Sequence, residues 1–425
     1  MAPDGQRGKD LKPLLNLPRS PAGSYLRRAV ARRRERSHYP LAALLHREFL
    51  TWVLEYAGHR LGLRHPFPVY ENGEDRGIYP LGDDTVIGGS PDPRGEVRVA
   101  LAGDWGSGTD EAGEVARQMM RFCPHYTIHL GDVYYVGDGG EVQENCLGIP
   151  DPRHSFKPGR WPAGSVGTFA LNGNHEMYAL GYGYFDVFLP ALGMRPCPGG
   201  APAGQRASFF CLRNDHWILV GLDTGYNSIG IPGLEIFFQP DSRLPDPLVA
   251  WVREQVRPLV GGRGVILLSH HQYYSVFDVN FPVPAAQLAD VLERPVLWLW
   301  GHEHRLAIYG RHRLGRGLEA YGRCLGHGGM PVLLNTPPAP TTWPMVLYDN
   351  RPYPSDEHIS VGYNGFAILT LSGNRLTIDY RDLKNAQVVT EAWETDGGAL
   401  FGKEIRASTE AGVVYDPDRL SLAIS

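Results

Sequence analysis

The strongest constraint on the fold is a pattern that recurs along the chain from about residue 97. In each occurrence, a short apolar run ends abruptly in glycine or another small residue and is followed by polar residues. The segments are VRVALAGDWG, YTIHLGDVYY, GTFALNGNHE, WILVGLDTGY, GVILLSHH and PVLWLWGHEH. Each run has the length of a buried strand, and residues 110–122 and 246–259 are candidate helices between them. Strands that alternate with helices predict an α/β fold.

Polar residues gather where these predicted strands end. In open α/β sheets, ligands bind at the carboxyl ends of the strands. A glycine or small residue lets the backbone turn sharply there, so that the next side chain can point into a shared cleft. The five motifs are, in chain order, GDWG at 103–106, GDVYY at 131–135, GNHE at 173–176, SHH at 269–271 and GHEH at 301–304.

The residue types in these motifs form a coherent set of metal ligands. Aspartate and tyrosine oxygens suit hard cations, and imidazoles suit iron, zinc and manganese. One carboxylate can bridge two ions that lie about 3.5–4 Å apart. The motifs lack cysteine, which argues against a structural zinc site.

The order GDxG, GDxxY, GNHE, xxxH, GHxH resembles that of the calcineurin-like metallophosphoesterases, and within them the purple acid phosphatase branch. In the wider superfamily the first motif is usually DxH, and its histidine binds the first metal. Here that position is Gly106. In purple acid phosphatases the tyrosine of GDxxY supplies the missing ligand, and Tyr135 stands at that position. The resemblance covers roughly residues 97–330, with a weaker echo to about residue 382.

This resemblance implies a four-layer α/β/β/α sandwich, in which two mixed sheets are flanked by helices. It also implies two metal ions that share one carboxylate. The first, ferric iron in the family, would be bound by Asp104, Asp132, Tyr135 and His304. The second, Fe(II), Zn(II) or Mn(II), would be bound by Asp132, Asn174, His270 and His302. His175 would contact the substrate phosphate and protonate the leaving oxygen, and Glu176 would orient His175.

A charge balance favours a phosphate ester as the substrate. The charges of a trivalent and a divalent ion exceed those of Asp104, Asp132, tyrosinate Tyr135 and a bridging hydroxide, so the centre stays positive. Bound metal ions also lower the pKa of water. We therefore expect a phosphoric ester hydrolase in which a metal-bound hydroxide attacks a phosphate monoester.

Two alternatives stay open. One is a phosphodiesterase that acts on nucleotides or lipid head groups, and the other is a non-catalytic metal-binding scaffold. Purple acid phosphatases usually carry a further histidine after the fourth motif, but the residues that follow His271 contain none. Either His271 or His327 takes that role, or the substrate preference differs.

Several side chains near the motifs have ordinary structural interpretations. His129 alternates with Ile128 in a predicted strand and is expected to be packed rather than to bind metal. Trp105 and Tyr134 could line the pocket or simply pack in the core.

The rest of the chain divides into three regions. Residues 1–95 contain a basic arm at Arg27–Arg36, an amphipathic helix predicted over 41–62 and an irregular linker over 63–95. Residues 96–385 form the predicted catalytic domain, with long loops over 311–360 and a β-hairpin over 365–382. Residues 386–425 are predicted to be a C-terminal tail. Residues 25–62 could contact a partner or a membrane surface.

Composition narrows the class of protein. Of 425 residues, 43% are hydrophobic and 20% are charged, as in soluble globular proteins. The formal net charge of -5 does not indicate a general nucleic-acid binder. The five cysteines are scattered without a CxxC pair, which favours a reducing compartment. The N-terminus does not resemble a signal peptide, and no apolar run reaches the roughly 18 residues of a membrane span. The predicted location is the cytoplasm.

Overall fold

The computed structural model describes residues 62–71, 73, 75–82, 95–134, 136–150, 158–196, 200–228, 242–332, 334, 344–354 and 361–425. The predictions for the basic arm at Arg27–Arg36 and for a helix over 41–61 lie outside these residues, and so does Tyr135.

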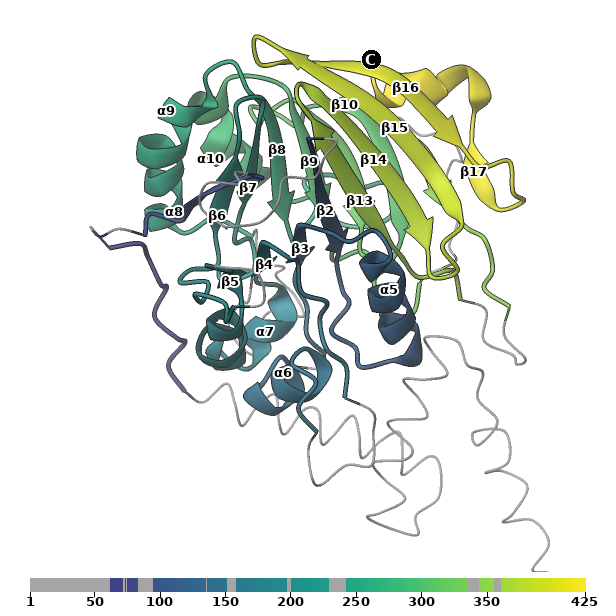
Figure 1. Cartoon of the computed structure of the whole chain (residues 1–425). Coiled ribbons are helices and arrows are strands. Elements are labelled where there is room, and N and C mark those ends of the chain that lie inside the picture. Colours follow the sequence, from purple (N-terminus) through teal and green to yellow (C-terminus); the bar gives the residue numbers. More distant parts are fainter. Residues whose placement is uncertain are drawn as a thin grey trace, which may run out of the picture.

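Eight strands form the first sheet, in the order β16-β15-β14-β13-β2-β3-β4-β5 (Figure 1). Strands β2, β3 and β4 are parallel, and β13 to β16 add antiparallel neighbours beside β2. The strands are β2 (Glu96–Ala102), β3 (Tyr126–His129), β4 (Gly167–Ala170), β5 (Gly193–Met194), β13 (Gly365–Ser372), β14 (Arg375–Asp382), β15 (Gln387–Asp396) and β16 (Ala399–Ala407).

Nine strands form the second sheet, in the order β1-β6-β7-β8-β9-β11-β10-β12-β17. Here β7, β8, β9 and β11 run parallel, and the other pairings include both directions. The strands are β1 (Ile78–Pro80), β6 (Phe210–Arg213), β7 (Trp217–Gly221), β8 (Gly264–Ser269), β9 (Val296–Trp300), β10 (Leu306–His312), β11 (Ala320–Leu325), β12 (Met345–Asp349) and β17 (Val413–Tyr415).

Helices cover the outer faces of both sheets. The eight-stranded sheet packs against α5 (Asp110–Met120), α6 (Gly139–Asn145) and the π-helical turn η1 (Gly183–Phe188). The nine-stranded sheet packs against the nearly continuous α8 (Asp246–Trp251), η3 (Val252–Val256) and α9 (Arg257–Val260), and against α10 (Pro282–Leu292). The remaining short helices are α7 (Asn174–Tyr178), η2 (Leu189–Ala191) and η4 (Pro417–Ala423).

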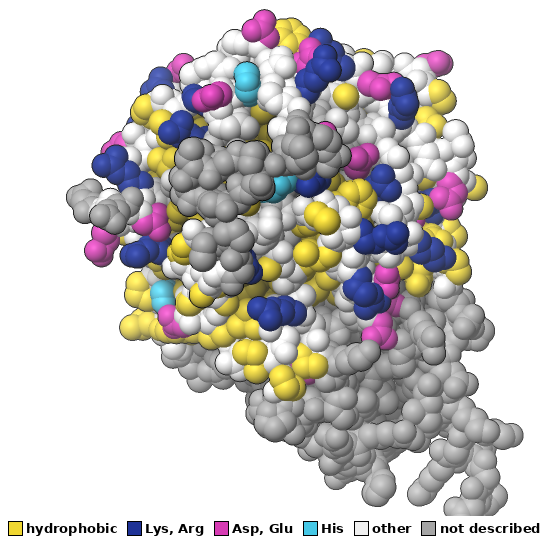
Figure 2. Space-filling view, viewed as in Figure 1, with side chains coloured by type: hydrophobic (Ala, Val, Ile, Leu, Met, Phe, Trp, Pro, Cys, Tyr) yellow, Lys and Arg dark blue, Asp and Glu magenta, His cyan; other side chains and the backbone are white. Residues whose placement is uncertain are grey.

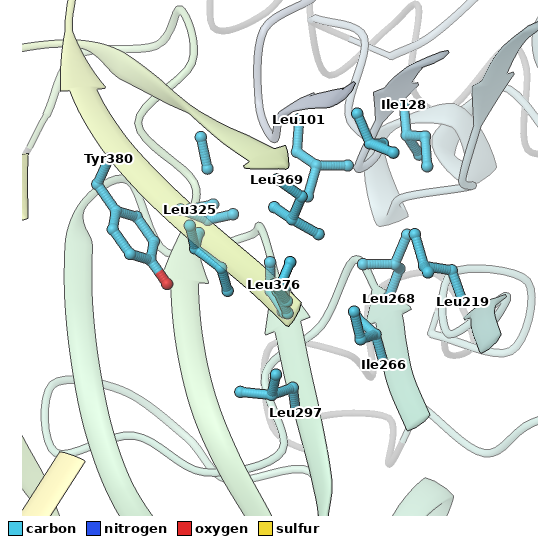
Figure 3. Packing of buried hydrophobic residues seen from close by; sticks show 14 of the residues in the cluster. Leu101, Ile128, Leu219, Ile266, Leu268, Leu297, Leu325, Leu369, Leu376 and Tyr380 are labelled. Atoms are coloured by element: carbon cyan, nitrogen blue, oxygen red, sulfur yellow. The ribbon is translucent and has the colours of Figure 1, made fainter. Parts of the chain in front are cut away.

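The main core lies between the two sheets. Figure 3 shows aliphatic side chains of the eight-stranded sheet, such as Leu101 and Leu369, in one cluster with Leu268 and Leu297 of the nine-stranded sheet. Strands β7, β8 and β9 are buried on both faces and are apolar almost throughout, whereas β14 alternates buried and partly exposed residues. The prediction of a sandwich of two mixed sheets with flanking helices is confirmed.

Three segments are more regular than the sequence analysis predicted. Residues 311–360, expected to be long loops, contain β11 and β12, so that prediction was wrong for these strands. The segment expected to be an irregular linker over 63–95 contains the edge strand β1. Residues 386–425, left as a tail, contain β15, β16, β17 and η4. By contrast, the hairpin predicted over 365–382 is formed by β13 and β14.

Charged side chains of both signs are interspersed on the face shown in Figure 2. Among the described residues on this face, the basic side chains do not form an extended surface of the kind that tracks a nucleic-acid backbone. Among the helices of the described part of the chain, none is both long enough and apolar enough to cross a membrane.

Candidate metal centre

The five motifs meet where strands of the two sheets end. Asp104 follows β2, Asp132 follows β3, and Asn174 begins α7 after β4. On the other sheet, His270 follows β8 and His302 follows β9. Backbone hydrogen bonds hold these turns together: Asp104 N donates to Gly131 O at 3.0 Å, and Gly301 N donates to His270 O at 3.0 Å.

Three of the predicted ligands have a left-handed backbone. The φ angles are 58° at Asp104, 73° at Asp132 and 66° at His302, and each residue follows a glycine. Non-glycine residues adopt this conformation at an energetic cost, and such residues cluster at functional sites. The conformation turns each side chain away from the strand direction and toward the other motifs.

Three of the residues predicted for the first metal, Asp104, Asp132 and His304, surround the hydroxyl of Tyr134. Oδ1 of Asp104 lies 3.4 Å from Nε2 of His304. The hydroxyl of Tyr134 lies 2.7 Å from Oδ1 of Asp104, 2.9 Å from Oδ2 of Asp132 and 3.0 Å from Nε2 of His304. Spacings of about 3 Å between donor atoms are those of ligands that share one cation with bonds of about 2.0–2.2 Å.

Tyr134 is therefore a site residue whose role the sequence analysis left open. The GDxxY spacing points to Tyr135, which lies outside the described residues, so its predicted role stays a prediction. Burial and the carboxylates of Asp104 and Asp132 raise the pKa of the Tyr134 phenol well above its usual value. The GDVYY motif contains two adjacent tyrosines, either of which could be a site residue, and the family spacing selects the second.

The backbone at Gly106 leaves no room for the histidine that DxH would supply. Gly106 forms a β-bridge with Val133. A Cβ atom at Gly106 would lie 2.9 Å from both Asp132 O and Val133 Cα. A side chain there requires a shift of the Asp132 turn, so the first-metal ligand must come from elsewhere in the site.

The residues predicted for the second metal also converge. Nε2 of His270 lies 3.2 Å from Oδ1 of Asp132, 3.1 Å from Oδ1 of Asn174 and 3.2 Å from Nδ1 of His302. Two ring nitrogens, a carboxylate oxygen and an amide oxygen thus face a common point. Asp132 offers Oδ1 to this group and Oδ2 to the first, which is the arrangement of a bridging carboxylate.

The buried charges of the site interact strongly. Burial alone would raise the pKa of Asp132, but His270 and His175 hold it well below the usual value. Burial opposes protonation of His270, yet the charge of Asp132 raises the pKa of His270 to about 10. Burial and the nearby His270 lower the pKa of His302 to about 4. The site therefore holds a buried anion that demands a cation beside it.

Glu176 accepts hydrogen bonds from two of the turns that carry the ligands. Its Oε2 accepts hydrogen bonds from the backbone N–H groups of Asp132, at 3.2 Å, and of Gly173, at 3.0 Å. Burial, followed by the charge of Asp132, raises the pKa of Glu176 well above its usual value. The described contacts of Glu176 thus join the turns after β3 and β4, and its predicted role of orienting His175 stays a prediction.

His175 lies at the solvent side of the centre. Its side chain is 23% exposed, and its Nε2 lies 3.8 Å from Oδ2 of Asp132. Its backbone N–H donates to Oδ1 of Asp132 at 3.1 Å, and its ring lies 4.3 Å from that of Tyr134. A phosphoryl group on the metal side of His175 would be within reach of this ring.

His271 is buried beside the second-metal ligands. Its ring lies 4.6 Å from that of His302 and 5.0 Å from that of Phe281. Its Nδ1 lies 3.1 Å from the hydroxyl oxygen of Thr224, which also accepts the backbone N–H of His271 at 3.0 Å. One nitrogen of His271 lies within 4.8 Å of ligand atoms of His270 and His302. Thr224 was not identified from the sequence.

The other histidine and tryptophan candidates pack in the interior. The carbonyl of His327 accepts hydrogen bonds from Gly365 and Asn364, and the flanking Gly326 and Gly328 lie against Asp104 and Gly103 of the first motif. His129 stacks edge-on against Trp161, and its Nδ1 accepts the backbone N–H of Gly131 at 3.1 Å. Trp105 is buried and donates to Ala112 O at 2.6 Å. His129 and Trp105 are therefore packed residues.

Comparison with known proteins agrees with this site at the level of the family. The model of the family described as calcineurin-like phosphoesterase matches residues 97–306. The match starts in β2 and ends just after GHEH, so it contains all five motifs. A search of curated proteins gave no match.

Solved structures with a similar fold have little sequence in common with the chain. GAP50, the anchor in the inner membrane complex of Plasmodium, is 13% identical, with 75% of this chain and 90% of that chain covered and a TM-score of 0.40. PhoD is 12% identical, with 77% of this chain and 76% of that chain covered and a TM-score of 0.41. Vacuolar protein sorting 29 from Cryptosporidium parvum is 12% identical, with 74% of this chain and 99% of that chain covered and a TM-score of 0.26.

Proposed function

We propose that this centre binds two metal ions and hydrolyses a phosphate monoester. The observation that carries the proposal is the position of Asp132. Its two carboxylate oxygens face two separate groups of donors, one around Asp104 and His304 and the other around Asn174 and His270. A single bridging carboxylate between two such groups is the arrangement of a two-metal site.

The donor atoms of the two groups suit two different metal ions. The first group consists of carboxylate, phenol and imidazole donors, which suit Fe(III). The second adds an amide oxygen and two imidazoles, which suit Fe(II), Zn(II) or Mn(II). Nε2 of His270 lies 3.2 Å from Nδ1 of His302. A cation bound by both nitrogens would account for this close approach.

When bound, two such ions would lower the pKa of a water molecule and offset the charge of a phosphoryl group. The chain's own residues would do the rest. Asp132 would fix the separation of the two ions. His175, at the exposed edge, would donate a hydrogen bond to a phosphoryl oxygen and protonate the leaving oxygen. His271 would support His302 from the buried side.

The preference for a monoester rests on the resemblance to the purple acid phosphatase branch. Gly106 at the DxH position and the tyrosines of GDVYY carry that resemblance. The interspersed charges in Figure 2 offer nothing specific to a polyanionic diester on that face.

The test is to compare turnover of an aryl phosphate monoester with that of an aryl diester, using the full chain loaded with iron, zinc or manganese. We expect monoester turnover that disappears in Asp132→Ala. Diester preference would instead indicate a phosphodiesterase. Turnover that persists in Asp132→Ala, or no turnover with both ions bound, would refute the proposal.

A further inference from the structure

Helix α7 carries a hydrogen bond between two of its own side chains. Asn174, the first residue of the helix, donates from Nδ2 to the hydroxyl oxygen of Tyr178 at 3.0 Å. Residues four apart lie on the same face of a helix, so this pair is a direct consequence of α7 being helical. Tyr178 belongs to none of the five motifs.

The hydrogen bond holds the Asn174 amide in place with its oxygen toward the centre. Oδ1 of Asn174 lies 3.1 Å from Nε2 of His270, on the side where the second metal would bind. A carboxamide has an acceptor end and a donor end, and only the oxygen can bind a cation. With the amide reversed, the NH2 group would point at the metal position.

Burial makes this orientation costly to lose. Asn174 is 8% exposed, so water has little access to its amide. Without the Tyr178 hydroxyl, the buried amide would lose a hydrogen-bond partner and with it a contact that holds the amide beside the centre. A group that holds a metal ligand in place in this way commonly changes metal affinity when it is removed.

We infer that Tyr178 is a positioning residue for the second metal, acting through the amide of Asn174. This inference rests on the proposed function, because it assumes that the second group of donors holds an ion. Tyr178 also stacks edge-on against His175, with ring centroids 4.9 Å apart. Its ring therefore supports the group proposed to contact substrate, while its hydroxyl supports the metal ligand.

Tyr178→Phe separates these two contributions, because it removes the hydroxyl and keeps the ring. We expect a second-metal affinity about 10–100-fold weaker, with first-metal affinity and thermal stability unchanged. The measurement is a calorimetric titration of Zn(II) or Mn(II) into full-length protein stripped of metal. Tyr182→Phe is the matched control, because the Tyr182 hydroxyl donates to Leu63 O at the surface.

Combining Tyr178→Phe with Asn174→Ala provides a second check. If Tyr178 acts through Asn174, adding Tyr178→Phe to Asn174→Ala produces no further loss of metal affinity. An unchanged second-metal affinity in Tyr178→Phe, or an equal loss at both metals, overturns this inference alone. Wild-type protein that binds no second metal overturns the proposed function together with it.

Discussion

The hydroxyl of Tyr134 lies 2.7 Å from Oδ1 of Asp104, inside the group of donors predicted for the first metal. This contact matters because the neighbouring Tyr135 is the residue that the family spacing selects. The contacts of Tyr134 are those that the family spacing predicts for Tyr135.

Conservative variants of the two tyrosines identify the ligand. A phenolate bound to Fe(III) is expected to give a purple colour, as the family resemblance implies. The contacts of Tyr134 predict that Tyr134→Phe loses the visible absorption band, whereas the family spacing predicts that Tyr135→Phe loses it. Absorption spectra of protein with a measured iron content decide the matter. Bleaching in Tyr135→Phe alone would assign the ligand by the family spacing and leave Tyr134 as a hydrogen-bond partner of the carboxylates.

Glu176 is expected to tolerate loss of charge but not loss of its oxygen. Its raised pKa favours the neutral acid, and its Oε2 accepts two backbone N–H groups. Glutamine keeps an acceptor, so Glu176→Gln should stay within a few-fold of wild-type metal affinity. Glu176→Ala leaves these buried donors unpaired at a cost of about 1–3 kcal/mol, or roughly 5–150-fold in affinity. Equal effects of the two changes on metal titrations would argue against this role.

The two sheets are joined by a fully buried ion pair between Arg323 on β11 and Glu391 on β15. The guanidinium donates to both carboxylate oxygens, at 2.8 and 2.6 Å. Arg323→Met should cost about 3–5 kcal/mol, because Glu391 then stays buried without its partner. The double variant Arg323→Met, Glu391→Leu should recover much of this loss. Unfolding in urea measures both, and additive losses would contradict the account.

Stability should fall in mild acid because of buried histidines. Burial lowers the pKa of His327 to about 4, below its unfolded value of about 6.5. The unfolded chain therefore binds more protons than the folded one between these values, so the free energy of unfolding falls as pH drops through this window. The full effect is about 3 kcal/mol. His327→Gln should show a shallower fall between pH 7 and pH 4.5 than wild type, whereas parallel curves would contradict the prediction.

The sequence revealed the strands that carry the motifs, because buried strands that end in glycine have a strong local signature. It also predicted that the side chains that follow these strands lie close together, since motifs at the ends of parallel strands share one edge. These residues are Asp104, Asp132, Asn174, His270, His302 and His304. Glycine precedes Asp104 and Asp132 because a Cβ at Gly103 would lie 2.8 Å from Gly301 Cα, and one at Gly131 would lie 2.7 Å from His270 Nδ1.

What the sequence did not reveal depends on long-range packing. The run AYGRCL of strand β11 has a weak strand signal because it contains Gly322. In the fold, Gly322 lies against the ring of Trp300 on the neighbouring strand β9. The supporting contacts of Thr224 and Tyr178 require knowledge of which turns meet. Tyr134 and Tyr135 can be told apart only by where each side chain points.

The most direct test of the central claim is a count of metal ions per chain in purified full-length protein, by elemental analysis and metal titration. The account predicts two ions in wild type, weaker binding of the first in His304→Ala, weaker binding of the second in Asn174→Ala, and weaker binding of both in Asp132→Ala. A single ion in wild type, or two ions retained in Asp132→Ala, would contradict it.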